Sequence, residues 1–324
     1  MEPQVENATP HTDQGWSASV NVDDIPKTHS SDPARRCREL ATALEQGKLL
    51  FFPRTPIDIP GEDLEFLLAQ RQHKHSYHKN IAYRPAQDRV TGYTRGEVDA
   101  DRLFRVLKAY CHSVAEALGR LLPTYAEQWK LDYANFRPAR EESREAHRSD
   151  VMHVDAFDSR PTNGALILRL FTNINLKEVR QWATSDPFPV TVDRLVGTRD
   201  LPLPKPQGSS VVDRARLGAL QLARRVGLPI VARSAYDEFM LRMNKQMKKN
   251  RHFQDTCPRY LSDFPPGSSW LVFADMVPHM VLRGQYALDQ TFFVPRSALT
   301  STDSAPASVL EKLCGGRLTF APTA

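Results

Sequence analysis

The chain has 324 residues, and 41% of them are hydrophobic, which is enough to bury the core of one large domain or two small ones. Lys and Arg number 43 against 38 Asp and Glu, so the net charge of +5 mildly favours an anionic substrate, an acidic membrane surface or nucleic acid. No run approaches the roughly 20 apolar residues of a spanning helix, so we expect no transmembrane segment.

The first thirty residues are mostly polar, which predicts a disordered N-terminal arm and no secretory signal. The cysteines are far apart and have no C-x-x-C spacing, as expected for free thiols in a reducing compartment. They are Cys37, Cys111, Cys257 and Cys314. We therefore expect a cytoplasmic protein.

The first predicted helix starts at Asp32 and Pro33 and ends at Gly47, and a short buried strand follows at 49–53. Apolar residues recur every three or four positions between 98 and 122, before Pro123, and predict a long helix. Residues 137–148 alternate in charge and predict a solvated loop.

The aliphatic stretch at 163–175 predicts a strand that is buried on both faces. Two helices are predicted at about 210–225 and 235–250, the second with Ser234 as its N-cap and Asp237 three residues on. The last predicted elements are strands at 269–275, 278–284 and 290–295.

This order predicts an α+β protein whose sheet core is elaborated by helices, because an alternating parallel fold would place a helix after each strand. We divide the chain into an arm (1–30), one domain (31–300) with a helical insertion at about 176–262, and a C-terminal extension (301–324).

His153 and Asp155 lie one residue apart in the sequence HVDAF, so in an extended strand both side chains point to one face. His279, at the start of a later apolar strand, can supply a second imidazole. Two histidines and one carboxylate form the facial triad of non-haem Fe(II) oxygenases, which leaves open positions for a 2-oxoacid and O2. The alternatives are a surface pair at 153 and 155 and a hydrogen-bonded core histidine at 279.

A chelated 2-oxoacid needs a cation for its far carboxylate, and Arg169, in the middle of the strand at 163–175, suits bidentate capture. A structural salt bridge to Asp or Glu is an equally good interpretation of this buried arginine. Further candidates for this pocket are Thr172, Asn173, Asn175, Arg283 and Gln290.

Two long stretches, HVDAFDSRPTNGALILRLFTNIN and PHMVLRGQYALDQTFFVP, resemble the Kdo 3-hydroxylases, which are Fe(II)- and 2-oxoglutarate-dependent dioxygenases. The likeness extends from about residue 49 to 295 and includes KNIAYRP and FRPAREE. It departs from the family at Asp158, where relatives have proline, and in the more basic region 242–251.

The resemblance implies a double-stranded β-helix (jelly-roll, cupin-like) with flanking and inserted helices. It implies hydroxylation at C3 of 3-deoxy-D-manno-oct-2-ulosonic acid (Kdo) in Kdo-lipid A, to give the talo-octulosonic acid, with Fe(II), 2-oxoglutarate and O2. The metal ligands carry over onto His153, Asp155 and His279, and Arg169 takes the place of the family's arginine. Candidates for binding the anionic sugar are Lys79, Asn80, Arg84, Arg148 and Arg160.

A lipid-linked substrate makes peripheral association with the inner-membrane surface a hypothesis for the basic helix at 242–251, although a solvated helix face is the commoner reading. His73, His75 and His78 lack the cysteines of a structural zinc site. There is no phosphate-binding loop and no G-x-S-x-G, and we expect no nucleic-acid partner. The other functions kept open are a 2-oxoglutarate dioxygenase of another small anion and a non-catalytic cupin-like sugar-binding protein.

Overall fold

The computed structural model describes residues 19–24, 33–70, 80–93, 96, 98–138, 149–197, 201–206 and 231–321. Several predictions lie outside these residues: most of the N-terminal arm, the helix at 210–225, the histidines at 73–78, Lys79 and Arg148. No helix in the described ranges combines the length and the apolar character that crossing a membrane requires. All four cysteines are free thiols, as predicted.

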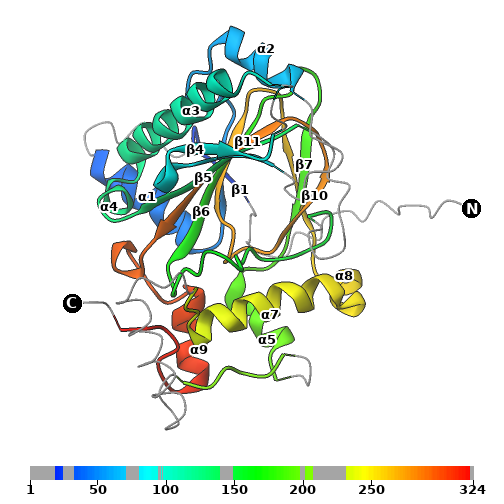
Figure 1. The fold of residues 1–324 in the computed structure, drawn as a ribbon. Coiled ribbons are helices and arrows are strands. Elements are labelled where there is room, and N and C mark those ends of the chain that lie inside the picture. Colours follow the sequence, from blue (N-terminus) through cyan, green and yellow to red (C-terminus); the bar gives the residue numbers. More distant parts are fainter. Residues whose placement is uncertain are drawn as a thin grey trace, which may run out of the picture.

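Two β-sheets form the centre of this mixed α+β protein (Figure 1). The large sheet has eight strands, in the order β1 (Ser19–Asn21), β2 (Leu49–Phe52), β9 (Ser269–Phe273), β6 (Leu166–Asn173), β11 (Ala287–Val294), β5 (Lys130–Arg137), β3 (Ile81–Arg84) and β4 (Arg89–Thr91). The small sheet has three strands, in the order β10 (His279–Arg283), β7 (Arg180–Thr184) and β8 (Tyr260–Phe264). β1 and β2 pair in parallel, and the other pairs are antiparallel.

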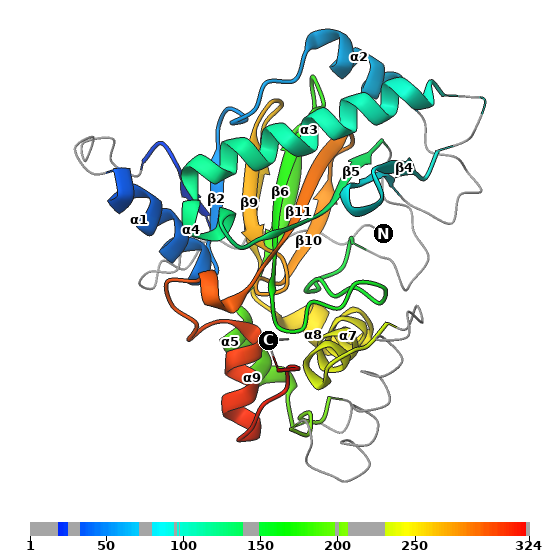
Figure 2. The ribbon, with the colours of Figure 1, turned by 60° about the vertical axis from the view of Figure 1, so that its left-hand side comes forward.

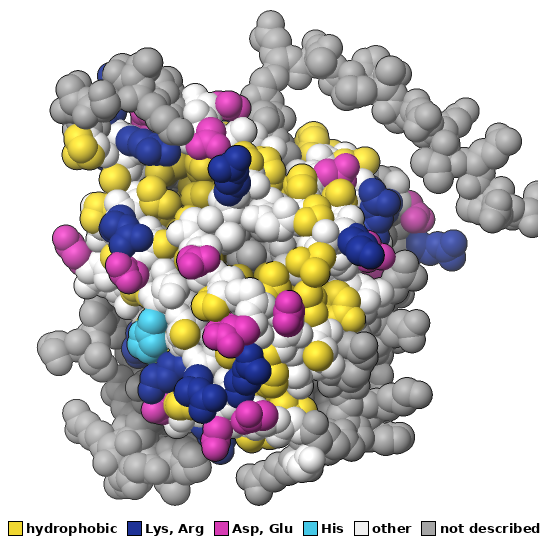
Figure 3. Space-filling model, turned by 90° about the horizontal axis from the view of Figure 1, so that it is seen from above, with side chains coloured by type: hydrophobic (Ala, Val, Ile, Leu, Met, Phe, Trp, Pro, Cys, Tyr) yellow, Lys and Arg dark blue, Asp and Glu magenta, His cyan; other side chains and the backbone are white. Residues whose placement is uncertain are grey.

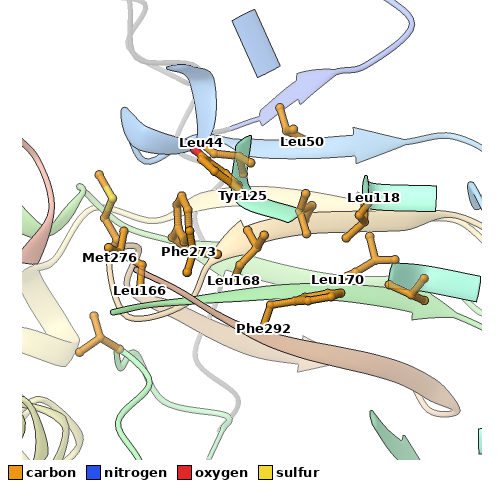
Figure 4. Close-up of a cluster of buried hydrophobic side chains, with 14 of the residues drawn as sticks. Leu44, Leu50, Leu118, Tyr125, Leu166, Leu168, Leu170, Phe273, Met276 and Phe292 are labelled. Atoms are coloured by element: carbon orange, nitrogen blue, oxygen red, sulfur yellow. The ribbon is translucent and has the colours of Figure 1, made fainter. Parts of the chain in front are cut away.

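Strand β6 is buried along its whole length because both of its faces are covered. Leu166, Leu168 and Leu170 point to the side that carries the main hydrophobic cluster, together with Phe273 and Phe292 of neighbouring strands (Figure 4). The alternate residues face the small sheet, where Phe171 meets Trp182 of β7 with ring centroids 4.7 Å apart. The space between the two sheets is therefore filled by side chains, and Arg169 belongs to this inner face.

Helices cover the outer face of the large sheet and one end of both sheets. Helix α3 (Ala100–Leu121), capped by Asp99, crosses the outer face (Figure 2) with α1 (Pro33–Glu45), α4 (Pro123–Ala126) and α2 (Gly61–Ala69) around it. The group at the end of the sheets consists of α5 (Phe188–Leu195), α7 (Ala235–Lys249), α8 (Arg251–Thr256) and α9 (Pro306–Cys314).

On the face seen from above the view of Figure 1, charged side chains of both signs are interspersed with apolar ones (Figure 3). Lys and Arg side chains gather toward one edge of this face, with Asp and Glu side chains beside them.

The C-terminal segment is attached to the body of the protein by a buried carboxylate. Glu45 at the end of α1 accepts hydrogen bonds from the main-chain N–H groups of Thr300 and Ser301, each at 2.8 Å, and from the Tyr125 hydroxyl at 2.7 Å. Leu310 of α9 is buried in the main hydrophobic cluster. The residues predicted as an extension therefore pack against the rest of the described chain.

The elements with strong periodicity or aliphatic content are confirmed: α1, β2, α3, β6, α7, β9, β10 and β11. Helix α7 has the predicted capping box between Ser234 and Asp237. The sequence predicts a helical insertion at about 176–262. This prediction is wrong in part, because the segment also contributes β7 and β8 to the small sheet. These strands are five residues long, and β8 alternates between exposed and half-buried positions, which leaves little apolar signal in the sequence.

Candidate metal centre

The two predicted histidine ligands are brought together by a β-bridge between distant parts of the chain. His153 donates its main-chain N–H to the carbonyl of His279 at 3.1 Å, and the N–H of His279 returns to the carbonyl of His153 at 2.9 Å. The next alternate residue, Asp155, donates its N–H to the carbonyl of Ala274 at 2.8 Å. The segment that carries HVD thus bonds to the start of β10 at His153 and to Ala274, just after β9, at Asp155. Its alternation directs the side chains of His153 and Asp155 to one side.

Each imidazole is oriented by a main-chain carbonyl. Nδ1 of His153 lies 2.8 Å from the carbonyl oxygen of Val151, and Nδ1 of His279 lies 2.9 Å from that of Val277. Because a carbonyl oxygen only accepts, Nδ1 must carry the proton, and in the neutral ring Nε2 keeps a free lone pair. This is the arrangement that commonly fixes a metal-ligating histidine.

The free nitrogens converge on one carboxylate. Oδ1 of Asp155 lies 3.7 Å from Nε2 of His153 and 4.0 Å from Nε2 of His279. The three ligand atoms all lie within 4.8 Å of one another, and all three residues are buried. Trp182 stacks on the ring of His279 with centroids 5.0 Å apart and an angle of 11° between the planes, which restricts that ring further.

The protonation states suit a divalent metal. Burial lowers the pKa of His153 to about 3, with the charges of His279 and Lys248 acting in the same direction. Burial also lowers the pKa of His279. Burial alone would raise the pKa of Asp155, but Arg169 and the two histidines hold it well below its usual range. At neutral pH the cluster therefore offers two neutral imidazoles and one carboxylate, the donor set of a facial triad.

Arg169 holds the second oxygen of that carboxylate. Its Nη1 donates to Oδ2 of Asp155 at 2.6 Å, and its Nη2 donates to Oδ1 of Asp289 at 2.5 Å. The structure thus contains the salt bridge that was one of the two interpretations of this arginine. With Oδ2 engaged, Oδ1 is the oxygen that faces the histidines, which favours monodentate binding of a metal.

Asp289 was not identified from the sequence, although it is fully buried in β11. Besides Arg169 it accepts from Nδ2 of Asn135 at 2.8 Å and from Nε of Arg137 at 2.7 Å. The sequence did contain a signal for Asp289, namely an acidic residue within an apolar strand, since a buried carboxylate requires positive or hydrogen-bonding partners. The strand register places Asp289 on the inner face of the large sheet, paired with Phe171 and close to Arg169.

The other residues predicted to hold a 2-oxoacid do not gather at the triad. Thr172 pairs with Leu288 and Gln290 pairs with Leu170, so both side chains lie on the face of the large sheet that carries the main hydrophobic cluster. Nδ2 of Asn173 donates to the carbonyls of Glu178 and Phe264, each at 2.9 Å. Thr172 and Gln290 therefore face away from the triad and are not co-substrate ligands in our proposal.

The remaining pocket candidates lie nearer the surface. Arg283 is exposed at the end of β10, and Asn175 accepts at its Oδ1 from the N–H groups of Lys177 and Glu178 in a turn. Arg169, which bonds directly to Asp155, is therefore better placed than either of them to contact a metal-bound co-substrate.

Among the candidates for substrate binding, Arg160 lies next to the triad. Its guanidinium carbon is 4.0 Å from the ring centroid of Tyr133 and 4.1 Å from that of Phe157, and its Nη1 forms an ion pair with Asp132. Arg160, Phe157 and the metal-ligand candidate Asp155 line the same cavity.

Arg84 lies on the same aromatic group, with its guanidinium carbon 5.0 Å from the ring centroid of Tyr133. Its Nε is buried and has no hydrogen-bond partner among the described residues. Asn80 is half-buried, and its carbonyl lies so close to Gly92 that a Cβ there would be 2.2 Å from it.

A family model described as 3-deoxy-D-manno-oct-2-ulosonic acid (Kdo) hydroxylase matches residues 27–317. The chain belongs to the Kdo hydroxylase family. The resemblance that its sequence motifs indicated is thereby confirmed. The search of curated proteins found no match to this Kdo hydroxylase family member.

Crystal structures of the Kdo hydroxylase KdoO, a non-haem Fe(II) α-ketoglutarate-dependent dioxygenase, resemble this chain throughout. The complex with cobalt(II) is 29% identical, with a TM-score of 0.77 over 95% of this chain and 99% of that chain. The complex with α-ketoglutarate and Fe(III) is 30% identical, with a TM-score of 0.73 over 90% of this chain and 94% of that chain.

Replacing Arg169 by Leu tests the buried ion pairs, because the change leaves Asp155 without its arginine and Asp289 with Arg137 as its remaining counter-charge. We expect the free energy of unfolding to fall by about 3–5 kcal/mol and cobalt(II) affinity to fall as well, measured by urea denaturation and calorimetric titration. Arg194→Leu is the control, since it removes a pair with Asp186 whose arginine is 45% exposed. An Arg169→Leu protein with the stability and cobalt(II) affinity of the unmodified chain would contradict this assignment.

Proposed function

We propose that this chain is an Fe(II)- and 2-oxoglutarate-dependent dioxygenase that hydroxylates C3 of Kdo in Kdo-lipid A. The observation that carries the proposal is the convergence of His153, Asp155 and His279, with both free Nε2 atoms and one carboxylate oxygen facing the same point. Membership of the Kdo hydroxylase family supports the choice of substrate.

The three side chains would hold the iron from one side and leave positions for a bidentate 2-oxoacid and for O2. When bound, the iron couples the oxidative decarboxylation of 2-oxoglutarate to succinate and CO2 with hydroxylation of the sugar carbon. The protein's own contribution is orientation. Val151 and Val277 fix the two rings, and Arg169 keeps Asp155 ionised and turned so that Oδ1 faces them.

Arg169 is also our candidate contact for 2-oxoglutarate. Its two Nη atoms are occupied by carboxylates, but its Nε is buried and has no hydrogen-bond partner among the described residues. A buried donor of a charged group gains from an anionic acceptor. The co-substrate carboxylate would supply such an acceptor.

We further propose that the core is a double-stranded β-helix. In support of this, the strand order β9-β6-β11-β5 in the large sheet faces the order β8-β7-β10, which the HVD segment extends through its bridge to His279. Successive strands from β5 to β11 thus alternate largely between two facing layers, as in a jelly roll.

For the anionic sugar we propose Arg160 and Arg84, which flank Tyr133 close to the triad. Guanidinium groups that lie on aromatic rings are held in a defined plane and can bind a carboxylate through two parallel hydrogen bonds. A lipid-linked substrate would bring the enzyme to the cytoplasmic face of the inner membrane, where the exposed side chains of Arg242, Lys245 and Lys249 on α7 could contact anionic headgroups.

The proposal is tested by following succinate release and O2 uptake with Fe(II), 2-oxoglutarate and either free Kdo or Kdo-lipid A in vesicles. We expect a +16 mass shift on the sugar, more of it with the lipid-linked substrate, and its loss in His153→Ala and His279→Ala. Turnover of a different anion, with no change in the mass of Kdo, would show that the enzyme acts on another substrate. Binding without succinate would indicate a non-catalytic protein.

Replacing Arg160 by Ala should raise the KM for the Kdo substrate roughly 10- to 100-fold, the loss of one charge-assisted contact. The KM for 2-oxoglutarate should change much less, because the side chain of Arg160 packs on Tyr133 and Phe157 and pairs with Asp132, whereas Arg169 pairs with the ligand candidate Asp155. The control is Arg233→Ala, which removes a surface arginine that donates to the carbonyl of nearby Asp158. Equal KM values for Kdo in the two variants would assign substrate binding to other residues.

A further inference from the structure

The segment that carries His153 and Asp155 has two edges, and one of them is occupied by the start of β10 together with Ala274, the residue that follows β9. His153 and Asp155 direct their N–H groups to that edge, toward the carbonyls of His279 and Ala274. Met152 and Val154 direct their main-chain groups the other way, and both residues are fully buried. Among the described residues no strand pairs with this second edge.

The side-chain amide of Gln254 in α8 hydrogen-bonds to the main-chain N–H and carbonyl of Met152 at the second edge. The N–H of Met152 donates to Oε1 of Gln254 at 2.9 Å, and Nε2 of Gln254 donates to the carbonyl of Met152 at 2.8 Å. Nε2 also donates to the carbonyl of Met247 at 2.8 Å. Because both carbonyls only accept, the orientation of this amide is determined, and it makes the two bonds that a neighbouring strand would make.

Asn244 of α7 bonds to one main-chain group at the next position of this edge, where its Nδ2 donates to the carbonyl of Val154 at 2.6 Å. The same helix holds the far end of the segment, where Oδ1 of Asp237 accepts from the N–H groups of Thr162 and Asn163 at 2.9 and 3.0 Å. Helices α7 and α8 thus hold the main chain on both sides of the proposed ligands.

We propose that Gln254 and Asn244 are positioning residues of the metal centre, and that their amides replace a neighbouring strand along the segment that presents His153 and Asp155. The inference rests on the proposed metal site and deepens it. A carbonyl or N–H group left unsatisfied in a buried site costs about 1–3 kcal/mol, so without these amides the segment would shift toward other partners. Such a shift would change the directions of His153 and Asp155, since side-chain direction follows the strand.

The experiment uses the full chain without iron and measures cobalt(II) affinity by calorimetry in Gln254→Glu, a variant of the same size. A carboxylate cannot donate, so it would face the carbonyls of Met152 and Met247. We expect the dissociation constant for cobalt(II) to rise on the order of tenfold or more, as for other groups that orient metal ligands.

Gln246→Glu is the matched control, because Gln246 lies on α7, is half-buried, and makes no side-chain hydrogen bond to the described residues. Asn244→Ala is the second variant and decides the matter if Gln254→Glu does not fold. Cobalt(II) affinity within about twofold of the unmodified chain in the folded variants would overturn the inference. If the unmodified chain bound cobalt(II) no better than His153→Ala, the proposed metal site itself would be wrong.

Discussion

A carboxylate that is buried away from water must have its charge compensated, and in this protein the compensation of Asp155 determines how the whole site is built. Arg169 binds one oxygen of Asp155 and, on its other side, the fully buried Asp289. Removing one member would leave a charge in a region of low dielectric constant, which is among the costliest changes in a protein interior. Asp289 is in turn held by Asn135 and Arg137 of β5.

This arrangement makes the candidate metal centre part of the core rather than an addition to its surface. The acid that would bind the metal comes from the HVD segment, its counter-ion from β6, and the next acid from β11, so three parts of the two sheets must be correctly registered at once. The imidazoles are similarly constrained, since each is bonded to a carbonyl two residues earlier and one is stacked on Trp182. Ligands held in this way need little reorganisation when a metal binds.

Sequence reasoning found the elements whose composition carries a strong local signal. The recurrence of apolar residues predicted α3 almost to its ends, and the aliphatic run predicted β6. The H-x-D spacing predicted that His153 and Asp155 share a face, and the structure brings them to His279. Strand β5 was missed because it mixes polar with apolar residues, and the polar ones look like surface residues in the sequence. Asn135 and Arg137 both bond to Asp289, which is more than 150 positions away.

The same limit applies to the site. The ion pairs of Arg169 join residues 14 and 120 positions apart, and the amide of Gln254 meets Met152 across 102 positions. Such bonds leave no periodicity in the chain, so the type of residue suggested a charged or polar contact but not its partner. Thr172 and Gln290 were wrongly predicted as pocket residues because successive side chains of a strand point to opposite faces of the sheet. Each of the two lies one position away from a residue on the inner face.

The central claim is that two imidazoles bind one metal ion through Nε2 while Nδ1–H donates to a carbonyl. Proton NMR of the cobalt(II)-loaded protein tests this most directly, because a ring N–H close to the paramagnetic ion gives a strongly shifted signal. The account predicts two such signals that exchange with solvent slowly, one of which is lost in His279→Ala and the other in His153→Ala. A spectrum without them, or one that neither substitution alters, would contradict it.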